Sequence, residues 1–131
     1  MKKIGMIGLG AMGHSVAENV MKNGFEMVEN PFLRSAADPF ITCHDGKYYY
    51  IYSTGKAIYI SSFDTLKDAT MSGSVCVFNP QGETEYSNDI WAPEMHFIDG
   101  YWYIYFAGCD GHNENHRMFV LKSKNENPMG E

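Results

Sequence analysis

The sequence predicts a mainly β fold that holds about two blades of a β-propeller, preceded by a short N-terminal strand-helix segment. The first observation is a repeat: a strand, an Asp-Gly turn and an aromatic strand occur around Asp45-Gly46 and again around Asp99-Gly100. The two glycines lie 100 − 46 = 54 residues apart, close to the length of one propeller blade of about four strands. A plain sandwich of meanders is the alternative, but nothing in a sandwich requires a repeat at a fixed offset.

The second observation is the composition of these stretches. Aromatic residues make up 15% of the 131 residues, and they gather in the repeated strands, where flat side chains pack well on a pleated surface. An Asp-Gly pair between apolar runs is a strong hairpin signal, because glycine accepts the positive φ that the turn needs. We expect strands at Phe40–His44, Lys47–Ser53, Ala57–Ser61, Ser74–Phe78, Met95–Ile98, Tyr101–Ala107 and Arg117–Ser123.

Residues 1–29 follow a different pattern. A short apolar strand over residues 2–7 leads into Gly8, Gly10 and Gly13, which satisfy G-x-G-x-x-G, and a helix is expected next. In this context the glycines let the backbone approach a pyrophosphate at a helix N-terminus. The segment resembles the N-terminus of 3-hydroxyisobutyrate and 6-phosphogluconate dehydrogenases, and that resemblance implies NAD(P) binding.

The dehydrogenase-like pattern is short. A helix over residues 14–23 and a second strand over residues 25–28 are expected, but no βαβ alternation follows them. One such unit cannot build a dinucleotide crevice, because the rest of the sheet is missing. We therefore divide the chain into a leader over 1–29 and a β region over 30–131, and we expect no cofactor. NAD(P) binding through the three glycines is kept as an alternative.

The charge and the apolar runs exclude some classes of protein. Sixteen acidic and ten basic residues give a formal net charge of −6, and no basic stripe exists that would neutralise nucleic-acid phosphates. The longest apolar run is far too short for a membrane span. Glycines interrupt the apolar N-terminus and no clear cleavage site follows, so we expect no signal peptide and a cytoplasmic protein.

The cysteine and histidine spacing predicts neither a disulfide framework nor a metal site. Cys43, Cys76 and Cys109 are odd in number and lack CxxC spacing. Cys43 and Cys109 fall in or beside predicted strands, where we expect them to be small buried side chains. His112 and His116 are four residues apart, but they stand in a polar loop rather than on a helix that could hold zinc.

Asp38 is a candidate general base. It stands between Ala37 and Pro39, just before the first strand of the first repeat. In a propeller the innermost strand of each blade begins near the central axis, so an acid at this point projects into the axial pocket, where burial can tune it as a base. The alternative is that Asp38 caps a turn before Pro39, which is a common use of Asp.

The corresponding region of the second repeat holds Asp89, Trp91 and Glu94. A Trp beside acids suits carbohydrate binding, because sugar C–H faces stack on the ring while the acids bond hydroxyl groups. The alternative is that Trp91 fills the core between two blades. We take the three residues as candidate substrate-binding residues.

Three stretches in order carry a second resemblance. They are Asn30-Pro31 followed by residues 37–41, then residues 90–100, then residues 116–121. Together they resemble glycoside hydrolase family 43, in particular its exo-acting α-L-arabinofuranosidases. The resemblance implies a five-bladed propeller with an axial active site that hydrolyses arabinofuranosides or β-xylosides with inversion. It also implies that Asp38 is the general base, that Trp91 lines the subsite of the released sugar, and that the partner is an arabinose- or xylose-containing oligosaccharide.

The same resemblance sets a limit on activity. The family's general acid and the third carboxylate that raises its pKa lie on later blades, and Glu94 does not have the acid's role. With two of five blades the catalytic set is incomplete, so we expect weak or no activity of this chain alone. Two rival functions remain open: a noncatalytic carbohydrate-binding module, and a β module that self-associates through exposed blade edges.

Overall fold

The structure, a computed structural model, describes residues 3–4, 22–23, 26–27 and 38–130. By its internal contacts the chain separates into two compact units, Met1–Ser35 and Ala36–Glu131. The division into 1–29 and 30–131 that the sequence suggests stays a prediction. Within the described residues, no helix is long and apolar enough to cross a membrane.

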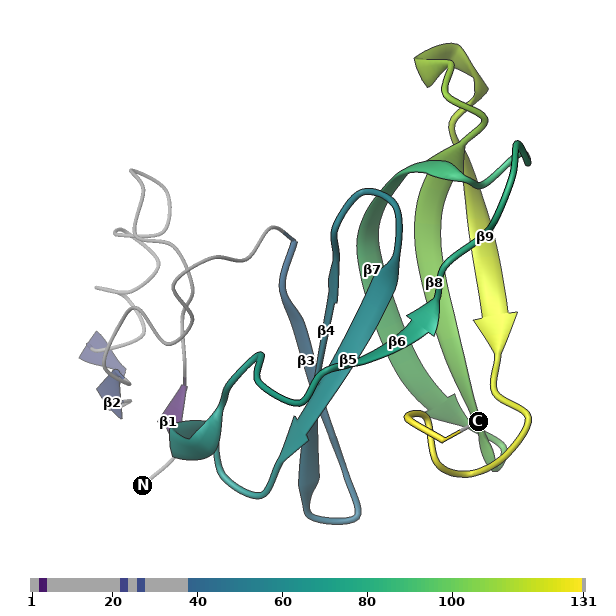
Figure 1. The fold of residues 1–131 in the computed structure, drawn as a ribbon. Coiled ribbons are helices and arrows are strands. Elements are labelled where there is room, and N and C mark those ends of the chain that lie inside the picture. The colour runs from purple at the N-terminus through teal and green to yellow at the C-terminus, as the bar shows by residue number, and fades with distance from the viewer. Residues whose placement is uncertain (1–2, 5–21, 24–25, 28–37, 131) are drawn as a thin grey trace. The chain divides into compact units, whose positions relative to one another are not determined.

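The first unit contains two short strands, β1 (Lys3–Ile4) and β2 (Glu26–Met27), which pair in parallel (Figure 1). Parallel pairing across an intervening segment is the arrangement of a βαβ unit, and both strands lie where the sequence predicts them. The described residues do not include Gly8, Gly10, Gly13 or nearly all of the helix expected over 14–23. NAD(P) binding by this unit therefore stays a prediction.

The second unit is built from two antiparallel sheets, which follow one another along the chain (Figure 1). The first has the strand order β3-β4-β5-β6, with bounds Phe40–His44, Lys47–Ser53, Ile58–Phe63 and Val75–Phe78. The second has the order β7-β8-β9, with bounds Asn88–Ile98, Tyr101–Cys109 and Arg117–Lys122. Two 3₁₀ helices, η1 (Leu66–Asp68) and η2 (Asn113–Asn115), lie in connections. The expected four strands per unit are present in the first sheet, whereas the second has three within 38–130.

The two predicted hairpins share one geometry. Asp45 and Asp99 have φ values of 49° and 50°, and the glycines that follow them, Gly46 and Gly100, have 75° and 83°. Two consecutive residues of positive φ form the type I′ turn, whose twist matches that of hairpin strands. Shifting the bounds of β3 and β4 by 54 residues gives 94–98 and 101–107, which lie within β7 and β8. The structure confirms the internal repeat over these hairpins.

The largest difference from the predicted strands is in β7, which begins at Asn88 rather than at Met95. Its pairing with β8 shifts register between Asn88 and Trp91, and again between Trp91 and Glu94. Extra residues in one strand interrupt the alternation of inward and outward side chains. The alternation of buried and exposed side chains by which a strand is recognised in a sequence therefore begins only after the second register shift, at Glu94.

Apolar side chains of both sheets form one core. β7 packs against β3 and β4 of the first sheet, and the ring of Tyr49 meets that of Trp102 across the two sheets, with centroids 5.0 Å apart. The fully or nearly fully buried members of this core are Ile51, Ile58, Ile60, Ile90, Met95, Trp102, Ile104 and Phe106. Removal of their apolar surface from water holds the sheets together.

The expectation that Cys43 is buried is wrong, because its side chain is exposed, whereas Cys109 is buried as predicted. Successive side chains of a strand point to opposite faces. His44, the next residue, contacts Phe97 of the second sheet with ring centroids 3.9 Å apart. Cys43 is therefore directed to the other face of its sheet, away from the shared core.

Met95→Ala should lower the free energy of unfolding by about 2–5 kcal/mol, because Met95 is fully buried in the core and its truncation leaves a cavity. The matched control is Met118→Ala. Met118 is 68% exposed, so its truncation should change the free energy of unfolding by less than about 0.5 kcal/mol. Urea unfolding followed by tryptophan fluorescence measures both, and equal effects would contradict the assigned core.

Candidate active site

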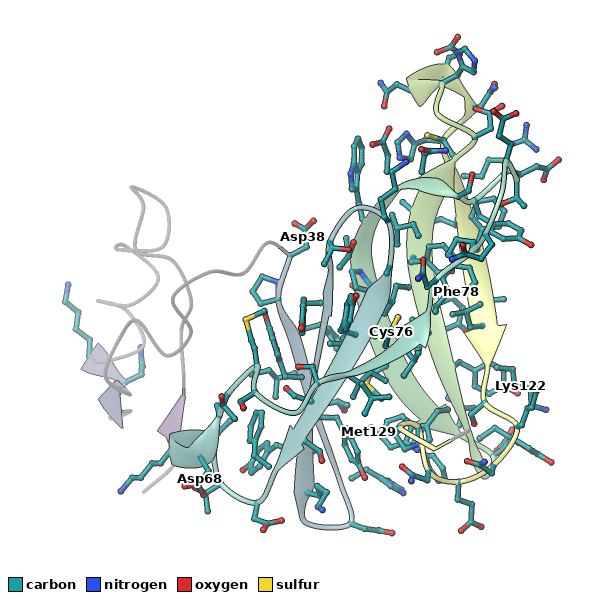
Figure 2. The ribbon with its side chains drawn as sticks, in the orientation of Figure 1. Asp38, Asp68, Cys76, Phe78, Lys122 and Met129 are labelled. Carbon is teal, nitrogen blue, oxygen red and sulfur yellow. The ribbon has the colours of Figure 1, made fainter. Side chains whose placement is uncertain are left out.

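The candidate residues lie just before one strand, β3, and along its neighbour β7, in which Glu94 stands near the middle. Asp38 stands immediately before β3, and Asp89, Trp91 and Glu94 belong to β7, which packs against β3. Figures 1 and 2 show β3 and β7 starting at the same end of the second unit, with Asp38 at the upper end of β3. The packing of the first strands of the two sheets places these residues on one side of the unit, as expected for the inner strands of adjacent blades.

Asp38 has a left-handed backbone and a free carboxylate. Its φ is 47°, and Ala92, which stands 54 residues later and also precedes a proline, has a φ of 46°. The side chain of Asp38 is exposed. It makes no hydrogen bond or ion pair with any other residue in the described part of the chain, so the turn-capping alternative has no contact to support it. Its oxygens are open to a water molecule or a ligand.

Trp91 is 46% exposed, which rules out the alternative that it fills the core. It lies between the two register shifts of β7, and its neighbours Asp89 and Ala92 have positive φ values of 48° and 46°. Residues other than glycine adopt this region rarely and at some cost in energy. The core position between the sheets is occupied instead by Trp102, which is 1% exposed.

The irregular part of β7 is bonded to the first sheet on its inner side. The amide of Ile90 donates to the carbonyl oxygen of Gly55 at 3.0 Å. The Ser53 hydroxyl donates to the carbonyl of Ile90 and accepts from the amide of Gly55, the latter at 2.8 Å. Ser53 closes the strand β4, which pairs with β3. These bonds therefore tie the segment that carries Trp91 to the sheet that carries Asp38.

A histidine supports the same segment from the outer side. The ring of His116 stacks on Trp91 with centroids 4.2 Å apart and planes inclined by 26°. Its Nε2 lies 3.1 Å from the carbonyl oxygen of Asp89, and its Nδ1 lies 3.0 Å from Oδ1 of Asn113. The Asp89 carboxylate accepts from the Cys109 thiol at 3.5 Å. The structure thus brings Asp89 and Trp91 together through His116.

The connection from β8 to β9 holds His116 in place. Asp110 accepts a hydrogen bond from the side chain of Asn115 at 2.9 Å and another from the amide of His112 at 3.0 Å. The hydrogen bond from Asn115, followed by the backbone bond, lowers the pKa of the Asp110 carboxyl below its usual value. Asp110 therefore stays ionised and keeps these bonds in moderately acidic solution, since protonation would remove an acceptor.

Glu94 belongs to a different local cluster. Its carboxylate lies 3.4 Å from Nε2 of His96, and both side chains are about half exposed. The His96 ring meets Phe40 of β3 with centroids 5.3 Å apart. Within 38–130, no hydrogen bond joins any two of Asp38, Asp89 and Glu94. The described residues also contain no group of three side chains arranged to hold a metal ion.

Two residues that position the site were not identified from the sequence, Ser53 and His116. Both act across long stretches of chain: Ser53 and Ile90 are 37 residues apart, and His116 and Asp89 are 27 apart. No local pattern reports a contact of that separation. The one feature of the sequence that could have pointed to His116 is its place as the first residue of 116–121, the third stretch that resembles glycoside hydrolase family 43.

Known enzymes match about three quarters of this chain in sequence. An extracellular exo-α-(1→5)-L-arabinofuranosidase of Streptomyces avermitilis is 36% identical over 104 residues, which are 76% of this chain and 22% of the relative. An enzyme of the same name from Streptomyces chartreusis is 32% identical over 105 residues, which are 77% of this chain and 32% of the relative. The chain thus spans between about a fifth and a third of the length of these relatives.

Solved structures share the fold. The endo-arabinase from Bacteroides thetaiotaomicron has a TM-score of 0.59 at 21% identity, with 72% of this chain and 32% of that chain covered. A thermostable family-43 glycoside hydrolase has a TM-score of 0.56 at 17% identity, with 77% and 33% covered. At these identities the likeness concerns the fold, and it confirms the prediction of a mainly β fold that forms part of a propeller.

The expectation of a cytoplasmic protein is wrong. Both Streptomyces relatives are named extracellular, which points to secretion rather than the cytoplasm. The expectation depended on the composition of the leader over 1–29. The leader has a different pattern from the region that resembles these enzymes, so its composition does not report their compartment.

A family model also matches most of the chain. The model described as glycosyl hydrolases family 43 matches residues 28–131. This range contains all the candidate residues of the site, from Asp38 to His116, and both sheets of the second unit. It also covers most of the 131 residues of the chain. The chain belongs to glycosyl hydrolase family 43.

Proposed function

We propose that this chain supplies the general base and the sugar-stacking surface of an inverting glycoside hydrolase that acts on α-L-arabinofuranosyl linkages of arabinan- or arabinoxylan-type polysaccharides. The observation that carries the proposal is the exposed carboxylate of Asp38, which makes no hydrogen bond to another described residue and precedes the strand β3, which packs against the strand that carries the exposed ring of Trp91. The family membership and the names of the two Streptomyces relatives support this substrate class.

In the proposed reaction, Asp38 removes a proton from a water molecule that attacks the anomeric carbon of the arabinofuranosyl unit. A carboxylic acid on the opposite side of the sugar protonates the leaving oxygen, so the configuration inverts. The Asp38 carboxylate suits the base, because neither of its oxygens accepts a hydrogen bond from another residue in the described part of the chain. We assign the acid to no residue of the described part of the chain, and we do not give this role to Glu94.

Trp91, Asp89 and Glu94 are the proposed substrate-binding residues. The exposed face of Trp91 offers a flat surface on which the C–H groups of a sugar can stack. The carboxylates of Asp89 and Glu94 can accept hydrogen bonds from hydroxyl groups, since within residues 38–130 each contacts one side chain, Cys109 or His96, and has two oxygens with several lone pairs.

Although the chain alone is expected to be weakly active, Asp38→Asn should lower its rate of hydrolysis of p-nitrophenyl α-L-arabinofuranoside further, by about 10²–10⁴-fold, because an amide cannot accept the proton of the attacking water. Binding of α-1,5-linked arabinotriose, followed by calorimetry, should change little, since the amide fills the same space. Proton NMR of the first product should show the inverted anomer.

The matched control is Asp99→Asn. Asp99 is also exposed and also has a positive φ, of 50°, and Asn is favoured at this turn position. Its substitution should leave both rate and binding unchanged. Measurable hydrolysis that is equally fast in the unmodified chain and in Asp38→Asn would contradict the assigned base.

Trp91→Ala should weaken arabinotriose binding by about ten- to a hundredfold, because loss of one stacking ring costs about 1–3 kcal/mol in comparable ring-on-ring contacts. Tyr101→Ala is the control, since Tyr101 is another exposed aromatic residue, 40% exposed, beside the turn at the other end of the sheet. Calorimetric titration of both variants measures the difference. Equal affinities of the two variants for arabinotriose would contradict the assignment of Trp91 to the binding site.

We also propose that copies of this chain associate through the outer face of the second sheet. Met118 and Val120 are 68% and 53% exposed there, beside Tyr105 at 38%. Shifting Tyr49 and Ile51, which pack in the core between the sheets, by 54 residues gives Tyr103 and Tyr105. The outer face therefore repeats the residues of a face that packs against another sheet, and large exposed apolar patches favour association.

Light scattering should give a mass of at least twice the 14.8 kDa of one chain, and Val120→Lys should return it to the mass of a single chain. A charge in an apolar contact is costly because it loses its hydration. Met71→Lys, in the connection between β5 and β6, is the control and should not change the mass. A single-chain mass for the unmodified protein at micromolar concentration would rule out this association.

A further inference from the structure

His116 does not belong to the apolar core, and its side chain contacts Trp91 and Asp89, which are far from it in sequence. It stands between η2 and β9, and its half-buried ring lies flat against Trp91. Both ring nitrogens are occupied: Nε2 faces the carbonyl oxygen of Asp89, and Nδ1 faces the side chain of Asn113. Because a carbonyl oxygen can only accept, Nε2 is the donor in that bond. The ring cannot rotate without losing both contacts.

The contacts of His116 join three parts of the second sheet. Asn113 belongs to η2, Asp89 lies at the beginning of β7, and His116 leads directly into β9. On the far side of the same segment, Ile90 is bonded to Gly55 and Ser53 of the first sheet. The hydrogen bonds of Ile90 to Gly55 and Ser53 therefore hold the backbone next to Trp91. The hydrogen bonds of His116 to Asp89 and Asn113 hold the imidazole ring that stacks on the indole of Trp91.

The stack also limits how Trp91 can be used. At a centroid separation of 4.2 Å and an inclination of 26°, one face of the indole is covered by the imidazole. The 46% of Trp91 that stays exposed must then come from the opposite face and the ring edge. A ring held in one orientation before the ligand arrives loses less conformational freedom on binding.

We propose that His116 is a positioning residue that backs Trp91, so that Trp91 offers one fixed ring face to one arabinofuranosyl unit. This inference rests on the proposed function for its ligand. His116 acts through Trp91 and does not touch the reacting atoms. It sets the affinity for the sugar and not the rate of the chemical step.

The test compares His116→Ala, His116→Phe and His112→Ala in the full chain. His112→Ala is the matched control, because His112 is an exposed histidine of the same connection whose own contact to Asp110 is made by its backbone amide. His116→Phe keeps a flat ring against Trp91 and guards against a variant that fails to fold. Far-UV circular dichroism verifies the fold of each variant.

The first readout is quenching of tryptophan fluorescence by acrylamide. Trp102 is 1% exposed and contributes little, so the accessible signal comes from Trp91. His116→Ala should raise the quenching constant about twofold, since a second ring face becomes accessible, while His116→Phe and His112→Ala should not. Unchanged quenching in a folded His116→Ala variant would overturn the inference, whatever the sugar result.

The second readout is the affinity for α-1,5-linked arabinotriose. His116→Ala should weaken it by about three- to tenfold, the effect of one aromatic pair, and should raise KM with kcat within a factor of two. His116→Phe should restore most of the affinity. A fall in kcat with unchanged KM would overturn the positioning role. If the unmodified chain binds no arabinotriose, the proposed function fails, while the quenching comparison still decides whether His116 backs Trp91.

Discussion

The site depends on the second of the two register shifts in the strand β7, which lies between Trp91 and Glu94. Along this strand Ile90, Pro93 and Met95 are buried, whereas Trp91, Ala92 and Glu94 are exposed. A regular strand alternates, so a buried Ile90 would place Met95 on the outer face and Glu94 in the core. Two consecutive exposed residues, with a left-handed backbone at Ala92, reverse the alternation. Core packing and an outward Trp91 and Glu94 are compatible only because of this irregularity.

Asp38, at the beginning of the first sheet, has the same left-handed backbone conformation as Ala92. The two residues show whether this conformation depends on a carboxylate. Asp38 and Ala92 have φ values of 47° and 46°, and each is followed by a proline that stands in the corresponding place of the repeat. Ala92 adopts the conformation with a methyl side chain. The carboxylate of Asp38 is therefore not needed to form this backbone, which is compatible with the proposed role of Asp38 as the base.

The parts of the fold that follow from local signals could be predicted from the sequence. Asp99-Gly100 and the alternating strands on both sides of it define a hairpin, and the repeat at Asp45-Gly46 defines its copy. The first half of β7 could not be predicted, because its register shifts remove the alternation by which strands are recognised. The exposure of Trp91 follows from those shifts. The sequence alone therefore could not decide whether Trp91 fills the core or belongs to the candidate site.

The contacts that position the site are tertiary, which is why the core between the sheets is part of the site. Asp38 belongs to the first sheet and Trp91 to the second, and no hydrogen bond joins the two residues within the described part of the chain. Their relative placement is fixed by the shared core, which includes Ile51 and Ile90, and by the hydrogen bond from Ser53 to the carbonyl of Ile90. A single sheet could form either residue's strand, but it could not fix the position of Asp38 relative to Trp91, because each sheet carries only one of the two residues.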